Sequence, residues 1–358
     1  MNKGTKQVMC GSVPIGGGAP VTIQSMTNTD TRDVKATVEQ IARLEDAGCQ
    51  IVRCAVPDAE AAAALGQIKK AIRLPLVADI HFDYRLALSA MENGADKIRI
   101  NPGNLGGEDR LRAVLRAAAL RQIPLRVGVN SGSLERELLE AYGGVTAEAL
   151  VESAVRTVRK VEALQFDQIV VSLKSPDVRL GFRAYTLASR QLEYPLHIGV
   201  TEAGTVRSGK VASAVGIGAL LLNGIGDTLR VSLTGDPVEE VRYAKEILEA
   251  AGLREKAIRL VSCPTCGRTR VDLEAITAAV EEGIEPLARK REAEGKRPLT
   301  LAVMGCEVNG PGEAREADLG VACGDGCGLL FRKGVPDRKV TAEQIVPALL
   351  QAIAQWED

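Results

Sequence analysis

The sequence predicts an α/β protein: a (β/α)8 TIM-type barrel over residues 1–252, followed by a small α+β domain over residues 253–358. Between residues 20 and 251, short β-branched runs alternate with amphipathic helical stretches eight times, which matches the length and the count of such a barrel. No Gly-x-Gly-x-x-Gly turn follows the first run, which argues against a doubly wound sheet. Near residue 253 the alternation ends.

Each expected strand is a short run of apolar and β-branched residues that begins after a turn or a loop. The eight expected strands are Val21–Gln24, Ile51–Ala55, Pro75–Ile80, Asp96–Ile100, Pro124–Val129, Gln168–Leu173, Pro195–Val200 and Thr228–Leu233. Amphipathic helices fill the gaps between them, for example Ala36–Ala47, Glu108–Arg121, Thr146–Leu164 and Val238–Ala251. Such a series places the strands side by side in a closed sheet, with the helices outside it.

The C-terminal hundred residues have a different order of elements. Two expected strands, Ala257–Ser262 and Leu299–Met304, are separated by a helix over Asp272–Ala293. A Gly-rich stretch, Gly320–Gly334, precedes a last helix over Thr341–Trp356. This order is typical of a small α+β domain.

Composition narrows the possible partners. The chain is 46% hydrophobic but only 3% aromatic, which suits an α/β core of Ala, Val, Leu and Ile. Its net charge of -1 gives no general basic surface, so we expect no nucleic-acid partner. The sequence shows neither a secretory leader nor an apolar run of the roughly 20 residues that span a bilayer. We therefore expect a cytoplasmic protein without a membrane partner.

Cationic residues occur within strands that are otherwise apolar. Four expected strands carry Arg53, Arg99, Arg126 and Arg230, and a fifth ends in Lys174. Because neighbouring residues of a strand point to opposite faces, these cations face the barrel interior if their neighbours face the helices. Buried charges are costly unless they are paired. Interior carboxylates could pair some of them, but their number favours a polyanionic ligand such as a diphosphate at the C-terminal ends of the strands.

Polar residues form an expected rim around these cations. His81 follows the third strand and His197 lies in the seventh, and Asn130 and Ser232 end two other strands. Glu202 follows the seventh strand and is the best candidate for an acid or base, because it is a carboxylate at a strand end beside cations. On sequence alone, Glu202 could equally neutralise an arginine.

The second domain carries a cluster of cysteines. Cys263 and Cys266 form a Cys-x-x-Cys turn, and Cys306 and Glu313 lie in a later Gly- and Pro-rich loop. Such a turn lets two thiolates bind one metal centre, and a distant third cysteine completes the site. Cys323 and Cys327 make a zinc site an alternative to an iron–sulfur cluster. The spacing leaves both open, and the anion-binding barrel favours iron.

Taken together, these segments resemble the 4-hydroxy-3-methylbut-2-enyl diphosphate synthases of the non-mevalonate isoprenoid pathway. The resemblance runs nearly end to end and rests on several motifs in the same order. They are Val21–Thr27, Arg99–Asn104, Gly128–Glu135, His197–Gly204, Gly226–Leu233, Ser262–Arg268 and Asn309–Ala314. The length is similar to the shorter bacterial form, without the domain inserted in plant-type members.

The resemblance implies a barrel joined to a small ferredoxin-like or sulfite-reductase-like α+β domain that carries a 4Fe–4S cluster. Its ligands would be Cys263, Cys266, Cys306 and Glu313, whereas Cys323 and Cys327 match no ligand position. A carboxylate is a harder ligand than a thiolate, so the bond from Glu313 to iron should be the most easily exchanged. Glu313 would then have a catalytic role, because its displacement frees one iron for the substrate.

The resemblance also implies the reaction. The substrate would be 2-C-methyl-D-erythritol 2,4-cyclodiphosphate, whose ring is opened and which is dehydrated by two electrons to 4-hydroxy-3-methylbut-2-enyl diphosphate. Glu202 would be the proton donor. The residues similar to the family's diphosphate contacts are Arg53, His81, Arg99, Arg126, Asn130, Lys174, Arg230 and Ser232.

The partners expected from the resemblance are a ferredoxin or flavodoxin as electron donor and a second copy of the chain in a head-to-tail homodimer. Two other functions compete with this one. A zinc-stabilised barrel could bind a phosphorylated sugar without redox chemistry. An aldolase-type barrel could use Lys174 to form a Schiff base.

Overall fold

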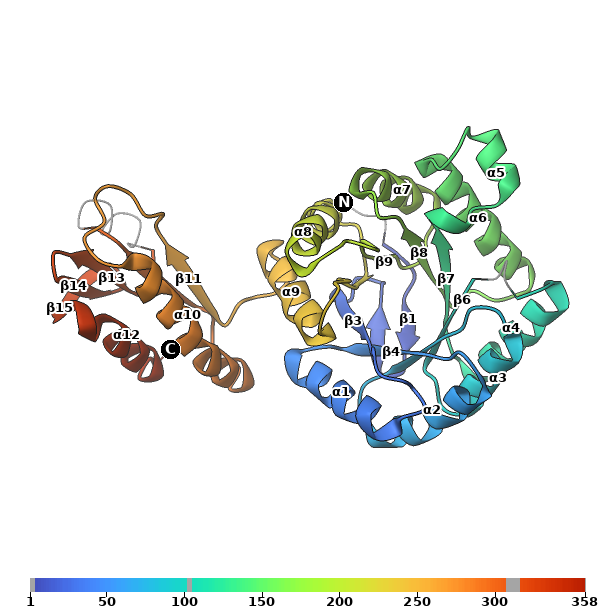
Figure 1. Cartoon of the computed structure of the whole chain (residues 1–358), viewed down its shortest axis with the longest axis horizontal. Coiled ribbons are helices and arrows are strands. Elements are labelled where there is room, and N and C mark those ends of the chain that lie inside the picture. The colour runs from blue at the N-terminus through green and yellow to red at the C-terminus, as the bar shows by residue number, and fades with distance from the viewer. Residues whose placement is uncertain (1–3, 102–104, 307–315, 358) are drawn as a thin grey trace. The chain divides into compact units, whose positions relative to one another are not determined.

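The computed structural model of the chain describes residues 4–101, 105–306 and 316–357 (Figure 1). Its internal contacts divide the chain into two compact units, one that ends at Arg254 and one that begins at Glu255. Each unit has its own hydrophobic core. No helix in the described parts of the chain is both long enough and apolar enough to cross a membrane.

The first unit is a TIM-like barrel, which confirms the predicted fold class. Its parallel strands are β3 (Thr22–Met26), β4 (Ile51–Ala55), β5 (Leu76–Asp79), β6 (Lys97–Ile100), β7 (Leu125–Asn130), β8 (Ile169–Lys174), β9 (His197–Ile198) and β10 (Thr228–Leu229). They hydrogen-bond in the order β8-β7-β6-β5-β4-β3-β10-β9. A parallel bridge between Val171 and Leu196 joins the two ends of this order and closes the barrel.

Helices surround this sheet (Figure 1). They are α1 (Val34–Ala47), α2 (Ala59–Ala71), α3 (Tyr84–Glu92), α4 (Glu108–Arg121), α5 (Arg136–Ala141), α6 (Ala147–Ala163), α7 (Val178–Gln191), α8 (Val206–Leu222) and α9 (Pro237–Ala250). Several begin directly after an aspartate whose carboxylate accepts a backbone N–H of the first turn, as Asp58 does before α2 and Asp177 before α7. These caps satisfy donors that helix geometry leaves unpaired.

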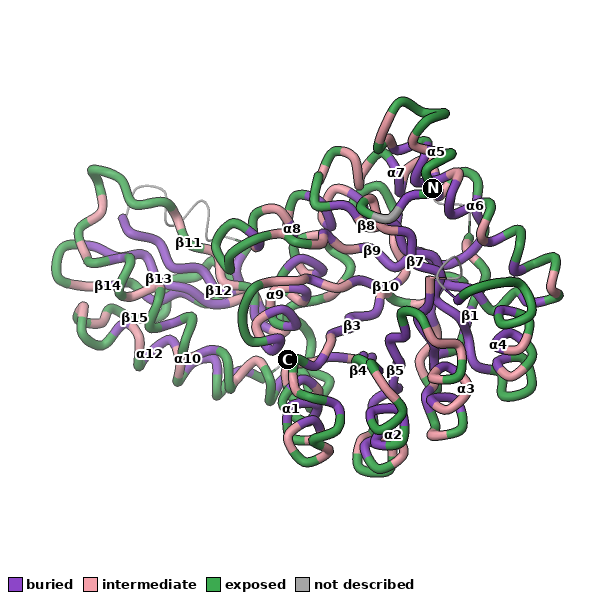
Figure 2. The backbone as a smooth tube through the Cα atoms, turned by 45° about the vertical axis from the view of Figure 1, so that its right-hand side comes forward, coloured by how far each residue is buried: buried purple, intermediate pink, exposed green. Residues whose placement is uncertain are grey.

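Strand alternation separates an apolar outer layer from a polar inner one. Ile23, Val52, Ile98 and Val127 belong to the large core that the strands share with the helices. The residues between them point to the other side, into the barrel. Both layers of the strands are buried (Figure 2). The barrel interior is therefore buried and polar, unlike the Val, Ile and Leu filling that is usual for this fold.

A short N-terminal hairpin, β1 (Val8–Cys10) and β2 (Val13–Ile15), closes one end of the barrel. Cys10 and Ile15 are fully buried and pack against Ile51 and Val77, which lie near the starts of β4 and β5. The turn between the two strands lies at residues 11–12, and the three glycines at 16–18 follow β2, each with a positive φ.

The last two barrel strands are much shorter than the sequence predicts. We expected six residues in each, and β9 and β10 each keep two. Just after β9, a Cβ atom at Gly199 would stand 2.5 Å from the backbone oxygen of Arg230, so this close approach of two backbone segments requires glycine.

The second unit is a five-stranded sheet with helices against it. Its strands are β11 (Ile258–Ser262), β12 (Leu299–Met304), β13 (Leu319–Gly324), β14 (Cys327–Arg332) and β15 (Val335–Thr341), and its α-helices are α10 (Leu273–Ala293) and α12 (Ile345–Ala354). The first three strands are parallel and the last two antiparallel. Both helices pack against the sheet in one core. The predicted α+β domain is confirmed, and its Gly-rich stretch forms β13 and β14.

Candidate active site

Three arginines from neighbouring strands lie in the barrel interior. Arg53 (β4), Arg99 (β6) and Arg126 (β7) are 3%, 4% and 0% exposed. Each occupies an inward position, because the residues on either side of it join the outer core. Strand alternation in the sequence therefore located these three cations in the interior.

Asp79 is the carboxylate at the centre of this group, and the sequence reading assigned it no role. Its Oδ1 lies 3.1 Å from Nη1 of Arg99, and its Oδ2 lies 3.9 Å from Nε of Arg53 and 3.6 Å from Nε2 of His81. Burial acts to raise the pKa of Asp79. The hydrogen bond with His81 and the charges of the arginines outweigh burial, so that the pKa falls well below its usual range. Asp79 is thus an anion with both oxygens engaged.

Arg126 has no such partner. None of its three guanidinium nitrogens has a hydrogen-bond acceptor among the described residues, although all three are buried. Burial lowers the pKa of Arg126, and the nearby charges of Arg53 and Arg99 lower it further. A buried guanidinium carries five N–H donors, and leaving them unsatisfied is costly. The arrangement is suited to an anionic ligand that accepts these donors.

Arg230 is paired from outside the sheet. Its Nη2 lies 3.2 Å from Oε2 of Glu240 on α9, and Glu240 also accepts the backbone N–H of Leu233 at 2.8 Å. The sulfur of Met26 lies 2.9 Å from Nη2 of Arg53 and 3.6 Å from Nη1 of Arg230. A thioether is a weak acceptor, so it neutralises neither cation. No sequence pattern indicated Glu240 as a partner of Arg230, because Glu240 lies inside a helix.

Lys174, His197 and Ser232 line one small cavity together with Arg230. Burial lowers the pKa of Lys174 and of His197 well below their usual ranges, and the surrounding arginines act in the same direction. His197 is therefore a neutral imidazole. Tyr185 on α7 links β8 to β9 beside this cavity. Its hydroxyl donates to the backbone oxygen of His197 at 2.6 Å and accepts the backbone N–H of Leu173 at 3.0 Å.

The remaining expected residues lie at the C-terminal ends of the strands. Asn130 ends β7 and is half-buried, whereas His81 and Glu202 follow β5 and β9 and are exposed. Glu202 has a φ of 53°, a left-handed conformation that side chains other than glycine rarely adopt. Such strain is found preferentially at functional sites. The cations and this rim belong to the same end of the barrel, where TIM-barrel active sites occur.

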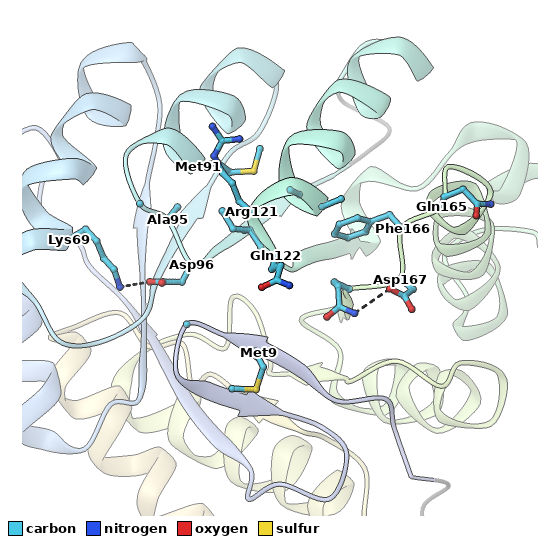
Figure 3. Close-up of a pocket in the computed structure, with 16 residues that line it drawn as sticks. Met9, Lys69, Met91, Ala95, Asp96, Arg121, Gln122, Gln165, Phe166 and Asp167 are labelled. Atoms are coloured by element: carbon cyan, nitrogen blue, oxygen red, sulfur yellow. Dashed lines mark hydrogen bonds and ion pairs between the residues drawn. The ribbon is translucent and has the colours of Figure 1, made fainter.

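A cavity of about 1000 Å³ lies at the opposite end of the barrel (Figure 3). It is bounded by Met9 of the hairpin and by residues that precede strands, among them Asp96, Gln122 and Asp167. Lys69 and Asp96 form an ion pair of 2.5 Å at its wall. Because this cavity contains neither the arginines nor the rim, we do not assign it to the active site.

In the second unit, the expected thiol ligands follow neighbouring strands. Cys263 comes directly after β11 and Cys306 two residues after β12, and these strands are parallel neighbours. Cys266 is exposed in the turn that follows Cys263. Parallel strands end at the same edge of a sheet, so the sequence segments that carry these thiols begin side by side. Glu313 lies outside the described residues.

The thiols suit a metal–sulfur centre. The backbone N–H of Gly305 donates to Sγ of Cys263 at 3.2 Å, a contact of the kind that stabilises ligating thiolates. Within residues 255–306 and 316–357, no three ligating side chains converge tightly enough to hold a metal ion. Cys323 lies near Cys263. The pKa of Cys323 is raised first by burial and then by the negative charge of the Cys263 thiolate. Cys323 is fully buried in the core.

Two family models match the chain one after the other. The GcpE TIM-barrel domain matches residues 5–245, and the GcpE protein C-terminal domain matches residues 259–355. Two similar proteins are named 4-hydroxy-3-methylbut-2-en-1-yl diphosphate synthase (flavodoxin). The one from Caldanaerobacter subterraneus subsp. tengcongensis is 55% identical over 353 residues, 99% of this chain and 97% of the relative. The one from Geobacter sulfurreducens is 56% identical over 353 residues, 99% of this chain and 98% of the relative.

Among solved structures, two dihydropteroate synthases share the barrel. The one from Yersinia pestis has a TM-score of 0.51 and 10% identity, and covers 69% of this chain and 97% of its own. The one from Stenotrophomonas maltophilia has a TM-score of 0.51 and 15% identity, with the same coverage of 69% and 97%. At these identities the likeness concerns the fold alone.

Proposed function

The chain belongs to the GcpE family of 4-hydroxy-3-methylbut-2-en-1-yl diphosphate synthases, and from this premise we propose which residues bind the substrate, donate the proton and hold the cluster. It is an iron–sulfur oxidoreductase of the non-mevalonate isoprenoid pathway. It reductively opens and dehydrates 2-C-methyl-D-erythritol 2,4-cyclodiphosphate to 4-hydroxy-3-methylbut-2-enyl diphosphate. The comparisons give no support to the zinc-stabilised sugar-binding barrel.

In our proposal, the barrel of residues 1–252 binds the cyclic diphosphate. The observation that carries this assignment is the buried Arg126, whose three nitrogens have no acceptor among the described residues. Phosphate oxygens would supply the missing acceptors through charge-assisted hydrogen bonds. The proposed contacts are Arg53, His81, Arg99, Arg126, Asn130, Lys174, Arg230 and Ser232. Asp79 would hold Arg99 in place and Glu240 would hold Arg230. Arg126 has no such carboxylate and would face the ligand.

Glu202 is the proposed proton donor. Two observations support it: the carboxyl follows β9 at the end of the barrel where the strands end, and its backbone is held in a left-handed conformation. Departure of a hydroxyl group as water needs a proton, and a carboxyl group positioned at that oxygen supplies it. Lys174 offers a second chemistry, because a lysine of lowered pKa suits Schiff-base formation. Borohydride trapping with substrate would reveal it, and we expect no adduct.

Residues 253–358 would hold a 4Fe–4S cluster through Cys263, Cys266, Cys306 and Glu313. Thiolates are the ligands that iron–sulfur clusters require, and the Gly305 N–H directed at Cys263 supports the thiolate form. When bound, such a cluster supplies the two electrons of the reduction one at a time. We assign no ligand role to Cys323, which is buried in the apolar core.

The proposed partners follow from the family. The relatives' names indicate an electron donor, flavodoxin, and ferredoxin is the other carrier of single electrons that we consider. We also propose a head-to-tail homodimer and a cytoplasmic location, on the strength of the resemblance of this chain to the family.

The assignment is tested by oxygen-free purification followed by three measurements on one sample. We expect iron and inorganic sulfide in equal amounts, turnover of the cyclic diphosphate with reduced flavodoxin, and an electron paramagnetic resonance signal of the reduced protein that changes when the substrate is added. A colourless protein that contains zinc and no sulfide would overturn the proposal.

A further inference from the structure

Lys97 is a second buried cation that has no hydrogen-bond partner within the described part of the chain, and it lies deeper in the barrel than the arginines. It is the first residue of β6, two positions before Arg99, and therefore points to the same inner side. It is 0% exposed, and its Nζ has no hydrogen-bond partner among the described residues. Below it, the hairpin residue Cys10 closes the barrel.

The carboxylates nearby are already engaged. Asp79, across the pairing of β5 with β6, contacts Arg99, Arg53 and His81. Asp96 precedes Lys97 in the chain but receives Nζ of Lys69 at 2.5 Å and the backbone N–H of Leu76 at 2.7 Å. Cys10 is no counter-ion, because burial raises the pKa of its thiol. No anion of the described chain therefore neutralises Lys97.

The inner wall offers Lys97 only neutral groups. Thr22 and Gln24 on β3, Thr228 on β10 and the Nδ1 atom of His197 on β9 are all buried and lack hydrogen-bond partners within the described residues. A neutral amide or hydroxyl solvates an ammonium group but does not cancel its charge. Cys10 would attract Lys97 only as a thiolate, a form that burial disfavours, whereas Arg126 and Arg53 both repel Lys97.

An apolar side chain at position 97 would be buried in the barrel at a lower cost in free energy than the lysine. Ile51 and Val77 occupy the corresponding layer of β4 and β5, where they pack against the hairpin. Replacing a buried, unpaired charge by an apolar group of similar size is often neutral or stabilising. The cost of Lys97 in the substrate-free barrel is offset only if a negative charge arrives above it.

We propose that Lys97 is a positioning residue for the diphosphate, forming a deeper cationic layer beneath Arg53, Arg99 and Arg126 that attracts the anion without touching it. This inference rests on the function proposed above, in which the barrel arginines bind the diphosphate. The attraction acts through a buried and poorly screened interior, where charges interact over longer distances than they do in water.

Substrate binding should therefore be coupled to proton uptake. In the substrate-free barrel, burial and the charges of Arg126 and Arg53 lower the pKa of Lys97 to about 8, against the opposing effect of Cys10. A bound diphosphate reverses the local field, so that Lys97 keeps its proton to higher pH. At pH 8 to 9, part of the protein must then take up a proton as the anion binds.

The test is titration calorimetry of the full-length protein with the cyclic diphosphate and, separately, with inorganic pyrophosphate. Titrations at pH 8.5 in two buffers of different ionisation enthalpy measure the number of protons taken up. We expect uptake by the wild type, a smaller uptake in Lys97→Met because Lys174 can still take up a proton, and affinity weakened about 10- to 100-fold in that variant. Lys160→Met, which alters an exposed lysine on α6, should match the wild type.

Thermal unfolding of the substrate-free proteins separates positioning from a purely structural role. Lys97→Met should unfold at the same or a higher temperature than the wild type, and Lys97→Gln serves as the second variant if the first does not fold. Unchanged affinity and unchanged proton uptake in a folded variant would overturn the inference. The variant Arg126→Met tests the proposed function separately. If the wild type and Arg126→Met bind the cyclic diphosphate equally well, or if the wild type does not bind it, the proposed barrel site itself is wrong.

Discussion

Arg99 and Arg126 lie directly opposite each other in the parallel pairing of β6 with β7, and both side chains are buried inside the barrel. Like charges opposite one another on adjacent strands destabilise a sheet. Asp79 pairs with Arg99, but the nitrogens of Arg126 have no acceptor in the described structure. The barrel thus contains a local repulsion between two arginines, which an anion bound at the proposed site would relieve.

Arg126→Met should separate stability from activity. The change removes an unpaired buried cation, so the free energy of unfolding should stay the same or rise by about 1–3 kcal/mol. The specificity constant should fall at least 100-fold, mainly through a higher KM, because the lost bonds hold the diphosphate. Urea unfolding and steady-state kinetics measure the two effects. Arg126→Lys should restore little, since an ammonium group lacks the planar fork; full rescue would contradict this role.

Asp79→Asn should destabilise the protein by about 3–5 kcal/mol, because it leaves Arg53 and Arg99 without their carboxylate. Denaturant unfolding gives the value. The control is Asp167→Asn, in which the amide oxygen can still accept from the neighbouring Gln168 at an exposed position. If both variants lose equal stability, Asp79 does not organise the cations.

Glu202→Gln should lower kcat by about 10²- to 10⁴-fold with a small change in KM, as loss of a general acid does. Glu202→Gly should lose the same activity but gain about 1 kcal/mol of stability, since glycine adopts the left-handed backbone without strain. Gln165→Gly is the matched control, because Gln165 has a φ of 60° and is exposed at the other end of the barrel. It should gain similar stability and keep full activity.

Cys306→Ser should remove the brown chromophore and abolish turnover in protein purified without oxygen. Cys327→Ser is its counterpart, because Cys327 lies on β14 and matches no ligand position of the family. That variant should retain iron, sulfide and activity. The opposite outcome, with metal lost from Cys327→Ser and kept by Cys306→Ser, would favour the zinc arrangement.

Stability should depend on pH through Lys97 in a defined direction. Its pKa is about 8 in the folded protein and 10.5 in the unfolded chain. Below pH 8 both states carry the charge, and its burial costs about 3 kcal/mol. Between pH 8 and 10.5 the folded state releases the proton first, so the unfolded state binds more protons and wild-type stability rises relative to Lys97→Met. The stability gap between the two proteins should narrow over this range in urea titrations; a constant gap would refute the buried charge.

Strand periodicity was sufficient to predict the barrel and the inward direction of Arg53, Arg99 and Arg126. It did not reveal Asp79 as their partner, because that contact depends on the register between β5 and β6. Lys97 follows Asp96 at the start of a strand, where sequence alone suggests a solvent-exposed polar pair. Its burial follows from the N-terminal hairpin, which is distant in the sequence.

The shortness of β9 and β10 could not be predicted from propensity either. Both segments have the composition of six-residue strands, and the close backbone approach at Gly199, just after β9, is a tertiary feature that composition does not show. The family resemblance supplied the function, which the comparisons confirm. The roles assigned to individual residues remain predictions that the variants above address.

The N-terminal hairpin covers one end of the barrel, so that the barrel is closed there. Because Cys10 and Ile15 are buried at this end, a ligand bound in the interior as proposed would enter and leave at the C-terminal ends of the strands. Product retains the diphosphate and must vacate before the next substrate molecule can settle. Successive turnovers therefore cannot overlap in one barrel, and accumulated product should act as a competitor of the substrate.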